Sequence, residues 1–432
     1  MKTLVEPLKL RSVPTQAEVK TEELGIMTRK LGSLATRACT FLFPLFGLFV
    51  ATLQLCDAYL HAAPRPVTTG RSEATLPWSQ DEVNRLTRTP HCQVILVESM
   101  PENLTYSMDA PRHASTYFSW NLLLSQATES VSIASFYWSL LAEPKYNASA
   151  VTEGRNIFEQ LLEKSGKLNV TIAQSGPRKN DTELEQLEAA GATIYWVDVA
   201  KLLGRGIIHT KLWTVDNRHG YLGSANMDWR SLTEVKELGV LFLNCPLFVE
   251  DLNKIHKGYC AAADSIPREW PSDLITQYNR SNPMRVSING FPSLVHLSAS
   301  PKEFNPPGRS FDLDTILDVI NKAEKFIHIS VMDYSPEIVS YDQHLRSEEQ
   351  QLIPHARVNH NKYMVTDKTA YIGTSNWSGD YFLYTGGAAF VVEEDRSLPR
   401  PDEEAGIPHK SIRDQLVDIF RRDWNSEYTF EQ

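Results

Sequence analysis

The chain has 432 residues, which is enough for about two ordinary domains. Apolar residues make up 42% and aromatic residues 10%, so a packed core is available and the chain as a whole is not disordered. The net charge of -10 argues against a surface that coats nucleic acid in general, although a local basic site is compatible with it. The 12 His and five Cys residues show no C-x-x-C, H-E-x-x-H or clustered spacing, so no zinc site is predicted.

An uncharged segment, "ACTFLFPLFGLFVATLQLC", occupies residues 38–56. At 1.5 Å per residue it is just long enough to cross a bilayer core of roughly 30 Å. We interpret it as an uncleaved transmembrane signal anchor, with a cytosolic tail at 1–37 and a polar stem at 57–88. A buried core helix and a cleavable signal peptide are the alternatives, although such a long leader is unusual for a signal peptide. Cleavage near residues 61–64 ("HAAP") would release a soluble body.

Glycosylation sequons and cysteines favour a lumenal body. The N-x-S/T sequons lie after the anchor, and a thin excess of basic residues lies before it, which together favour type II orientation. Five are predicted glycosylation sites: Asn103, Asn147, Asn169, Asn180 and Asn279. Cys92 begins the first strand-like run and Cys245 ends another, so a bridge between them would tie the first lobe shut, although the sequence does not establish the pairing.

In the first half, residues 89–283, strand-like and helix-like runs alternate. The predicted order is strand 93–99, helix 115–130, buried strand 131–141, helix 152–166, strand 168–175, helix 181–191, strand 193–199, strand 207–215, a tight turn, and a strand from 221. The helix at 181–191 carries Asp181 as its N-cap and Gly191 as its end. This alternation predicts a layered α/β lobe.

The second half, residues 284–432, repeats the order. Its predicted elements are strands 284–290 and 294–300, helix 312–325, strand 326–334, strand 388–394 and helix 411–424, and "FIHISVMDY" mirrors "VSIASFYW". The duplication predicts two α-β-α sandwich lobes related by a pseudo-two-fold axis.

The second lobe is shorter than the first. Ile133 and His209 are 76 positions apart, whereas the matching Ile329 and His360 are 31 apart, so 45 residues are missing between 335 and 357. The missing block should hold a helix, a strand and a helix. We favour a spliced or mis-assembled transcript, and the alternative is a compact second lobe with an uncovered sheet edge.

One motif occurs in both halves, as "GIIHTKLWTVDNRHGYLGSAN" (206–226) and "VNHNKYMVTDKTAYIGTSN" (358–376). Its shared letters are His-x-Lys, four residues, Asp, and then Gly-Ser/Thr-x-Asn. The residues are His209, Lys211, Asp216, Ser224 and Asn226 in the first copy and His360, Lys362, Asp367, Thr374 and Asn376 in the second. A single His-x-Lys carries no signal, but its repetition in equivalent places points to one composite site.

The two motifs suit a phosphodiester. On a strand, His and Lys two residues apart project from the same face. The lysines and asparagines would hold the non-bridging oxygens and stabilise the transition state. One histidine would attack phosphorus, and the other would protonate the leaving oxygen and then activate water. We favour His209 as nucleophile and His360 as general acid, with no metal or cofactor required.

Other motif residues are expected to support this catalytic set. Asp216 and Asp367 follow each lysine by five positions and are expected to brace the motif. Glu237, in "TEVKELGV", is a candidate to orient a histidine through its second ring nitrogen. The small Ser224 and Thr374 are predicted to bind phosphate together with the asparagines.

These residues resemble the phospholipase D superfamily. "GSANMDWRSLTEVKELGV", "VNHNKYMVTDKTAYIGTSNWSGDYF", "VILVESMPENL" and "SIPREWP" are similar to its single-span branch containing family members three and four, over about residues 92–428 apart from the missing block. The resemblance implies a type II glycoprotein of the endoplasmic reticulum, endosomes and lysosomes. It also implies a 5′ exonuclease acting on single-stranded DNA and RNA. A lysosomal compartment in turn predicts an acidic working pH, at which a histidine is substantially protonated and suits the general acid. A lysophospholipid transphosphatidylation activity is attached to the same branch.

Three functions stay open at this point: a lysosomal nuclease, a phospholipase or transphosphatidylase, and a catalytically dead membrane glycoprotein. The motif recognises only the phosphodiester, so it does not separate nucleic acid from phospholipid as the substrate. The resemblance favours the nuclease. Association of two chains as a homodimer stays open as well.

Overall fold

The computed structural model describes residues 91–146, 149–335, 353–395 and 410–429. The predicted tail, membrane anchor and stem lie outside these residues, as do Asn147 and residues 336–352 within the shortened part of the second lobe. Among the helices that are described, none combines the length and the apolar character needed to cross a membrane.

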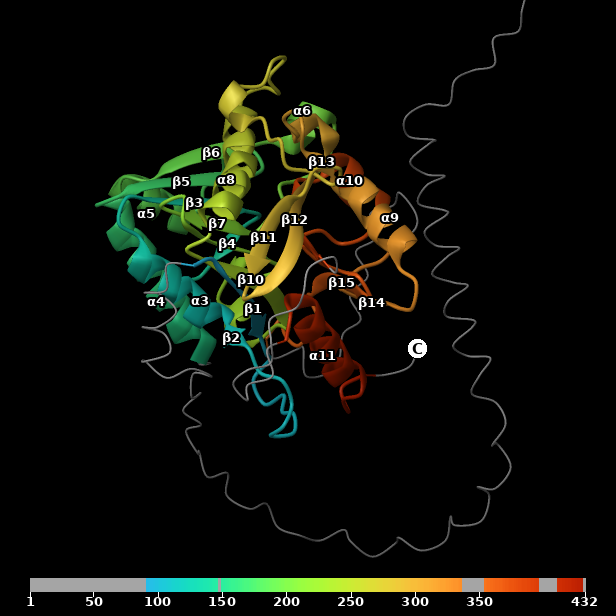
Figure 1. Cartoon of the computed structure of the whole chain (residues 1–432). Helices are drawn as coiled ribbons and strands as arrows, with labels where there is room; N and C mark the ends of the chain where they lie inside the picture. The colour runs from blue at the N-terminus through green and yellow to red at the C-terminus, as the bar shows by residue number, and fades with distance from the viewer. Residues whose placement is uncertain (1–90, 147–148, 336–352, 396–409, 430–432) are drawn as a thin grey trace, which may run out of the picture. The chain divides into compact units, whose positions relative to one another are not determined.

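The first lobe is built on an eight-stranded sheet in the order β2-β1-β10-β8-β7-β3-β5-β6 (Figure 1). The strands β3, β5 and β6 run parallel, and β7, β8, β10 and β1 add to them in antiparallel fashion. Their bounds are β1 Gln93–Ser99, β2 Ala114–Ser115, β3 Ser130–Ser135, β5 Asn169–Ser175, β6 Thr193–Val197, β7 Leu212–Val215, β8 His219–Gly223 and β10 Glu237–Leu243.

Helices cover both faces of this sheet. Apolar side chains of α3 (Thr116–Gln126), α4 (Ser149–Ser165) and α5 (Thr182–Ala190) pack on one face, and those of α8 (Pro246–Ala261) pack on the other. As predicted, α5 begins after Asp181, whose side chain accepts the Leu184 N–H, and ends at the left-handed Gly191. Four short elements lie between the longer strands and helices of this lobe: α6 (Val199–Leu203), α7 (Arg230–Thr233), β4 (Trp138–Ser139) and β9 (Met227–Asp228).

The second lobe holds a smaller sheet in the order β11-β12-β17-β16-β15-β14, with β13 beside β12. Its bounds are β11 Met284–Ile288, β12 Phe291–Ser300, β13 Ser310–Phe311, β14 Ile327–Val331, β15 Lys362–Thr366, β16 Thr369–Gly373 and β17 Gly387–Glu394. Its helices are α9 (Asp312–Lys322), α10 (Gly379–Tyr384) and α11 (Ile412–Trp424), and short 3₁₀ turns occupy Ser272–Leu274 and Lys302–Phe304.

Five neighbouring strands follow the same order in the two sheets. The run β1-β10-β8-β7-β3 of the first lobe corresponds to β12-β17-β16-β15-β14 of the second. In the described part of the second lobe nothing corresponds to β5 and β6, so β14 lies at the sheet edge. All five residues of β14 are only half-buried, whereas five of the six residues of β3 are buried. The missing block therefore exposes a strand that the first lobe covers.

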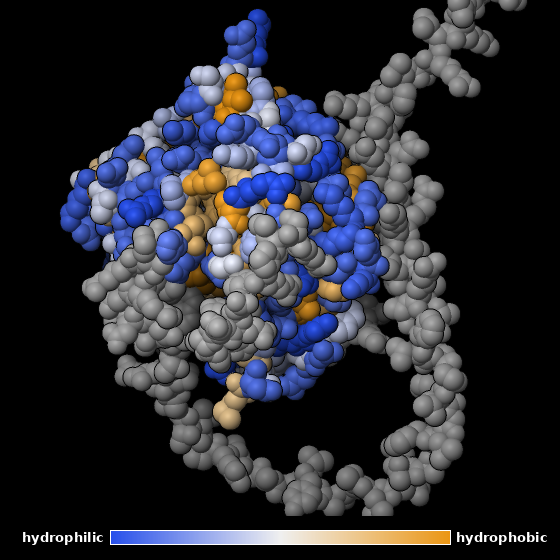
Figure 2. Space-filling view, in the orientation of Figure 1, coloured by the Kyte–Doolittle hydropathy of each residue, from blue (hydrophilic) through white to orange (hydrophobic). Residues whose placement is uncertain are grey.

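An apolar cluster joins the two lobes. Phe242 of β10 and Phe390 of β17 have ring centroids 5.1 Å apart, and Phe248 of α8 lies beside both. At the outer end, the Asn289 side chain hydrogen-bonds both backbone groups of Val94 in β1. Among the described residues, the face drawn in Figure 2 is mostly hydrophilic. This is expected, because many apolar residues of both sheets are buried in the common core.

A buried charge network also crosses between the lobes. The Glu98 carboxylate of β1 accepts hydrogen bonds from Lys236 Nζ at 2.6 Å and from both Nη atoms of Arg422 in α11 at 2.6 and 3.0 Å. His113 Nδ1 lies 2.7 Å from the same carboxylate. Burial alone would raise the pKa of Glu98, but Lys236, His113 and Arg422 outweigh it and hold the pKa well below 4.5. The stability that this carboxylate contributes is present above pH 4.5 and is lost only below it.

We predict that Arg422→Met destabilises the fold. It leaves Glu98 buried with fewer donors, and breaking a buried ion pair from one side costs about 3–5 kcal/mol. A thermal unfolding scan should show a clear fall in Tm. The control is Arg285→Met, because the Arg285 side chain is 74% exposed in its ion pair with Asp395 and contributes about 0–1 kcal/mol. Equal Tm values for the two variants would contradict a structural role for the network.

Candidate active site

The two motif histidines lie at the junction of the lobes, and each is held by the opposite lobe. The His209 N–H donates to Gly386 O at 2.8 Å, and the His360 N–H donates to Lys236 O at 2.8 Å. In both pairs a second backbone hydrogen bond returns to the segment two residues before the histidine, from the Gly386 N–H to Ile207 O and from the Lys236 N–H to Val358 O. Residue 209 was predicted inside a strand at 207–215, but β7 begins only at Leu212. The backbone before it leaves the first sheet because it pairs with the second lobe.

The two imidazole rings are neighbours, with centroids 6.4 Å apart and planes inclined by 64°. Nδ1 of His209 lies 2.8 Å from Thr374 O, and Nδ1 of His360 lies 2.8 Å from Glu237 Oε2. Because both partners are acceptors, Nδ1 carries the hydrogen in each ring. Nε2 is therefore the nitrogen left for substrate. Sequence reasoning named Glu237 as an orienting residue but did not say which histidine it serves.

The environments of the two rings separate their protonation. Burial lowers the pKa of His209 well below 6.5, and the neighbouring Lys211 and Lys362 lower it further. Burial also lowers the pKa of His360, but the Glu237 charge and hydrogen bond oppose that effect. For Glu237, burial raises the pKa, and the contacts with His360 outweigh it and leave the pKa lowered. Burial thus favours the neutral form of both rings, and of the two only His360 has a carboxylate beside it that favours the protonated form.

Each motif lysine folds back on its own histidine. Lys211 Nζ donates to His209 O at 2.6 Å, and Lys362 Nζ donates to His360 O at 2.7 Å. Burial lowers the pKa of Lys362 to about 7, against the opposing charges of Glu237 and Asp333, and it lowers the pKa of Lys211 well below 10.5. A bound phosphate would favour the charged lysines, because an opposite charge nearby stabilises the ammonium form.

The two motif asparagines have different partners in the two lobes. Asn376 Nδ2 donates to Asp333 Oδ2 at 2.7 Å, and Asn226 Nδ2 donates to the Tyr137 hydroxyl at 3.4 Å. Tyr137 and Asp333 each stand two residues after the equivalent strands β3 and β14. The Oδ1 atoms of both asparagines are buried without a hydrogen-bond partner. A bound ligand could therefore supply the missing partner or change the orientation of the amides. Sequence reasoning missed Tyr137 and Asp333, although the alignment of "SFYW" with "VMDY" contained them.

An early end to β3 places aromatic residues at the site. The sequence predicted one strand over 131–141, but β3 ends at Ser135 and the chain resumes pairing only at β4. The interruption puts the centroid of the Phe136 ring 5.5 Å from that of the His209 ring. Tyr381 of α10 packs edge-on against the His209 ring, with the two centroids 5.1 Å apart. Neither aromatic was predicted as a site residue, because alternation along a strand carries no sign of such a break.

The predicted phosphate-binding role of Ser224 and Thr374 is corrected by their contacts. Both side chains are fully buried. The Ser224 hydroxyl donates to Glu237 Oε2 at 2.5 Å and accepts the Leu238 N–H, and the Thr374 hydroxyl accepts the Ala388 N–H. These hydroxyls therefore hold β10 and β17 in place, and Ser224 also fixes the carboxylate behind His360.

The motif aspartates brace the lobes from the far end of the strands. Asp216 accepts hydrogen bonds from the backbone N–H groups of residues 128–130 and from the Thr128 hydroxyl. Asp367 accepts from the N–H groups of Glu324 and Lys325. Although they belong to the catalytic motif, both lie after β7 and β15, whereas the histidines lie before these strands. The contacts are bracing ones, as the sequence analysis expected.

A disulfide joins Cys92 and Cys245, with their Cα atoms 4.4 Å apart. Among the predicted glycosylation sites, Asn103, Asn169 and Asn180 are exposed and Asn279 is half-buried. Asn376, which also heads a sequon, is 4% exposed and lies in the site.

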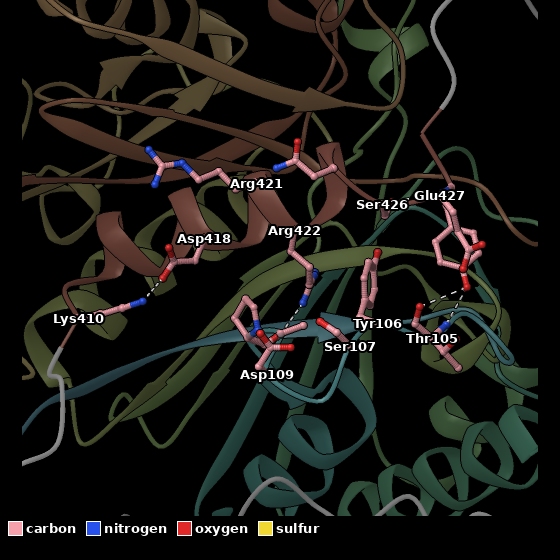
Figure 3. A pocket seen from close by; sticks show the side chains of 14 residues that line it. Thr105, Tyr106, Ser107, Asp109, Lys410, Asp418, Arg421, Arg422, Ser426 and Glu427 are labelled. Atoms are coloured by element: carbon pink, nitrogen blue, oxygen red, sulfur yellow. Dashed lines mark hydrogen bonds and ion pairs between the residues drawn. The ribbon is translucent and has the colours of Figure 1, made fainter.

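A separate pocket of 660 Å³ lies between the loop after β1 and α11 (Figure 3). Figure 3 shows Arg421, Arg422 and Lys410 on one side, with Lys410 paired to Asp418. Three basic and three acidic residues line it, and neither motif histidine does. Its charge is balanced, so it lacks the character of a phosphate site.

Comparison with known proteins gives the family. The family model described as "PLD3/4, PLD-like domain" matches residues 107–346. The chain belongs to this phospholipase D (PLD) family. A protein named "5'-3' exonuclease PLD3" from Xenopus laevis is 38% identical over 406 residues, which cover 78% of this chain and 80% of that protein. "5'-3' exonuclease PLD4" from Mus musculus is 36% identical over 409 residues, covering 79% and 80%. The PLD-like domain is a phosphodiesterase domain, so this PLD-family chain is an enzyme.

Two further findings describe the match. The solved structure of Nuc from Salmonella typhimurium, a phospholipase D family member, aligns with 39% of this chain and 93% of its own at 16% identity and a TM-score of 0.28. In the alignment with the Xenopus laevis protein, 78% of 432 residues is about 337, so about 69 of the 406 aligned positions have no residue in this chain. The chain is therefore shortened relative to that protein within the matched region.

We predict that Glu237→Gln slows cleavage of a chromogenic phosphodiester by about 100-fold. Without the carboxylate, the pKa of His360 falls further, so its acid form is lost at lower pH. The alkaline limb of the pH–rate profile should therefore move to lower pH. Glu163→Gln is the control, because that side chain is 61% exposed on α4. An alkaline limb unchanged from the wild type would contradict the role of Glu237 as the partner of His360.

Proposed function

We propose that this chain is a phosphodiesterase that acts through a phosphohistidine on His209, and that its substrate is single-stranded DNA or RNA cleaved from the 5′ end. The observation that carries the chemistry is the unequal pairing of the two rings, with a carbonyl behind His209 and a carboxylate behind His360. The relatives named as 5′-3′ exonucleases, which match most of the chain, support the substrate class.

The geometry supports a two-step displacement with no resident cofactor. Nε2 of His209 attacks phosphorus, the P–N bond forms, and the P–O bond to the leaving group breaks while His360 donates its Nε2 proton to that oxygen. His360 then takes a proton from water, the water oxygen attacks phosphorus, and the P–N bond breaks to release His209. Lys211, Lys362 and the asparagines stabilise the charge on the non-bridging oxygens in both steps.

We further propose that the body lies on the lumenal side of a membrane of the endoplasmic reticulum, endosome or lysosome, held by residues 38–56. The Cys92–Cys245 disulfide and the exposed sequon residues Asn103, Asn169 and Asn180 support an oxidising, glycosylating compartment. A His360 whose pKa lies below 6.5 suits catalysis at acidic pH, because the acid form disappears as the pH rises through that pKa.

The test uses the full-length glycosylated chain in detergent and a 5′-hydroxyl single-stranded oligonucleotide at about pH 5.5. We expect stepwise release of nucleotides from the 5′ end, which His209→Ala and His360→Ala should reduce by about 1,000-fold or more. An oligonucleotide left intact by a folded wild-type chain that transfers phosphatidyl groups instead would favour the lipid reaction. A folded chain inactive on both substrates would indicate a dead form.

Rapid acid-free quenching with a labelled substrate tests which histidine is the nucleophile. In His360→Ala, a labelled substrate whose leaving group departs without protonation should leave a base-stable label on His209, because the first step then needs no acid and the group that activates water has been removed. Peptide mapping locates the label. The opposite result would be a label on His360 in His209→Ala and no label on His209 in His360→Ala. It would make His360 the nucleophile and His209 the general acid.

A further inference from the structure

An arginine–tyrosine contact lies on the loop that leads to the reacting histidine and has no part in the steps above. Arg205 belongs to the first-lobe loop between α6 and His209, and its guanidinium carbon lies 4.2 Å from the centre of the Tyr384 ring in α10. Its Nη1 lies 3.3 Å from Asp380 Oδ1 on the same helix. The Arg205 side chain is 55% exposed, and within the described residues only Tyr384 and Asp380 contact its guanidinium. The tyrosine ring thus lies against the guanidinium, and much of the side chain stays accessible.

The backbone places this contact against the active site. Gly206 adopts a left-handed φ of 98°, and a Cβ atom there would lie 1.8 Å from Tyr384 O, so the loop runs directly against the end of α10. Tyr381, one helical turn before Tyr384, packs on the His209 ring. Residues three apart on a helix have Cβ atoms about 5–6 Å apart. The Arg205 guanidinium and the His209 ring therefore contact two tyrosines that stand one turn apart on the same short helix.

The chemistry of the contact suits a nucleobase. A guanidinium is planar, weakly hydrated and delocalised, and it stacks on aromatic faces, whereas an acyl chain gains nothing from a charged plane. Proteins recognise unpaired bases by stacking them on aromatic rings or on arginine planes. Asp380 balances part of the charge, and together with Tyr384 it favours one position of the guanidinium before a ligand arrives.

We propose that the exposed guanidinium of Arg205 stacks the base next to the scissile phosphate, with Tyr384 and Asp380 positioning the guanidinium. This assignment rests on the proposed nuclease function and adds the subsite through which the site distinguishes a nucleotide from other phosphodiesters. Arg205 contacts the base, and the two α10 residues act through it.

The experiment compares three substrates with the full-length chain: a single-stranded oligonucleotide, the same strand with abasic residues at its 5′ end, and bis(p-nitrophenyl) phosphate. Arg205→Lys keeps the charge and removes the plane. We expect it to raise KM for the ordinary strand about 10-fold with little change in kcat, and to leave the other two substrates unchanged. Tyr384→Leu should act in the same direction. The matched control is Arg178→Lys, because Arg178 is 63% exposed and pairs with Glu188 without an aromatic ring.

Any other outcome would contradict either the base subsite or the nuclease function. An equal loss on all three substrates would show that Arg205 only latches the lobes together, and no loss on any of them would show that it does not contact a base. A wild-type chain that cleaves bis(p-nitrophenyl) phosphate in a His209-dependent way, but leaves every oligonucleotide intact, would overturn the nuclease function itself and the base subsite with it. Failure of the subsite alone is thus distinguishable from failure of the function.

Discussion

The reciprocal backbone pairing of the two histidine segments is the constraint on which the site depends. His209 is hydrogen-bonded through its N–H to Gly386 of the second lobe, and His360 to Lys236 of the first. Neither lobe alone can therefore present its histidine in place. Several buried charged groups are concentrated at the same junction, where the carboxylates of Glu98 and Asp423 pair with Lys236 and Arg422. Such a network is stable only when every member keeps its partners, so the charges that support the site also require both lobes to be docked.

Near-symmetry of the halves brings the site together, and departures from it assign the roles. Glu237 begins β10 and Gly387 begins β17 at the equivalent place. A Cβ atom at Gly387 would lie 2.0 Å from Ser375 Oγ, so no second carboxylate fits there. One ring consequently rests on a charged acceptor and the other on a neutral carbonyl. That difference shifts the two protonation equilibria apart, which is what a displacement with one nucleophile and one acid requires.

The repeated motif and the alternation of elements predicted the two sheets and the central His and Lys residues. Sequence reasoning failed where a position depends on a partner far along the chain. Thr374 lies 165 residues from His209, and Glu237 lies 123 residues from His360. The hydroxyls of Ser224 and Thr374 were misassigned although their partners are only 13 and 14 residues away, because those partners lie on a neighbouring strand whose register the sequence does not give. Local periodicity indicates which face of an element is buried, but it does not identify the residues that pack against that face.

The shortened second lobe keeps the strands that matter for chemistry. The block that is missing would extend the sheet beyond β14, whereas the residues of the site lie on the other side, from β15 to β17. The strand β14 still pairs with β15 over five residues, and Asp333 still holds Asn376. The deletion changes how well β14 is shielded from solvent. Its residues Ile327, Ile329 and Val331 are only half-buried, at the edge of the sheet. An edge of this kind invites pairing with other chains. The deletion therefore threatens the solubility of the enzyme more directly than the geometry of its reaction.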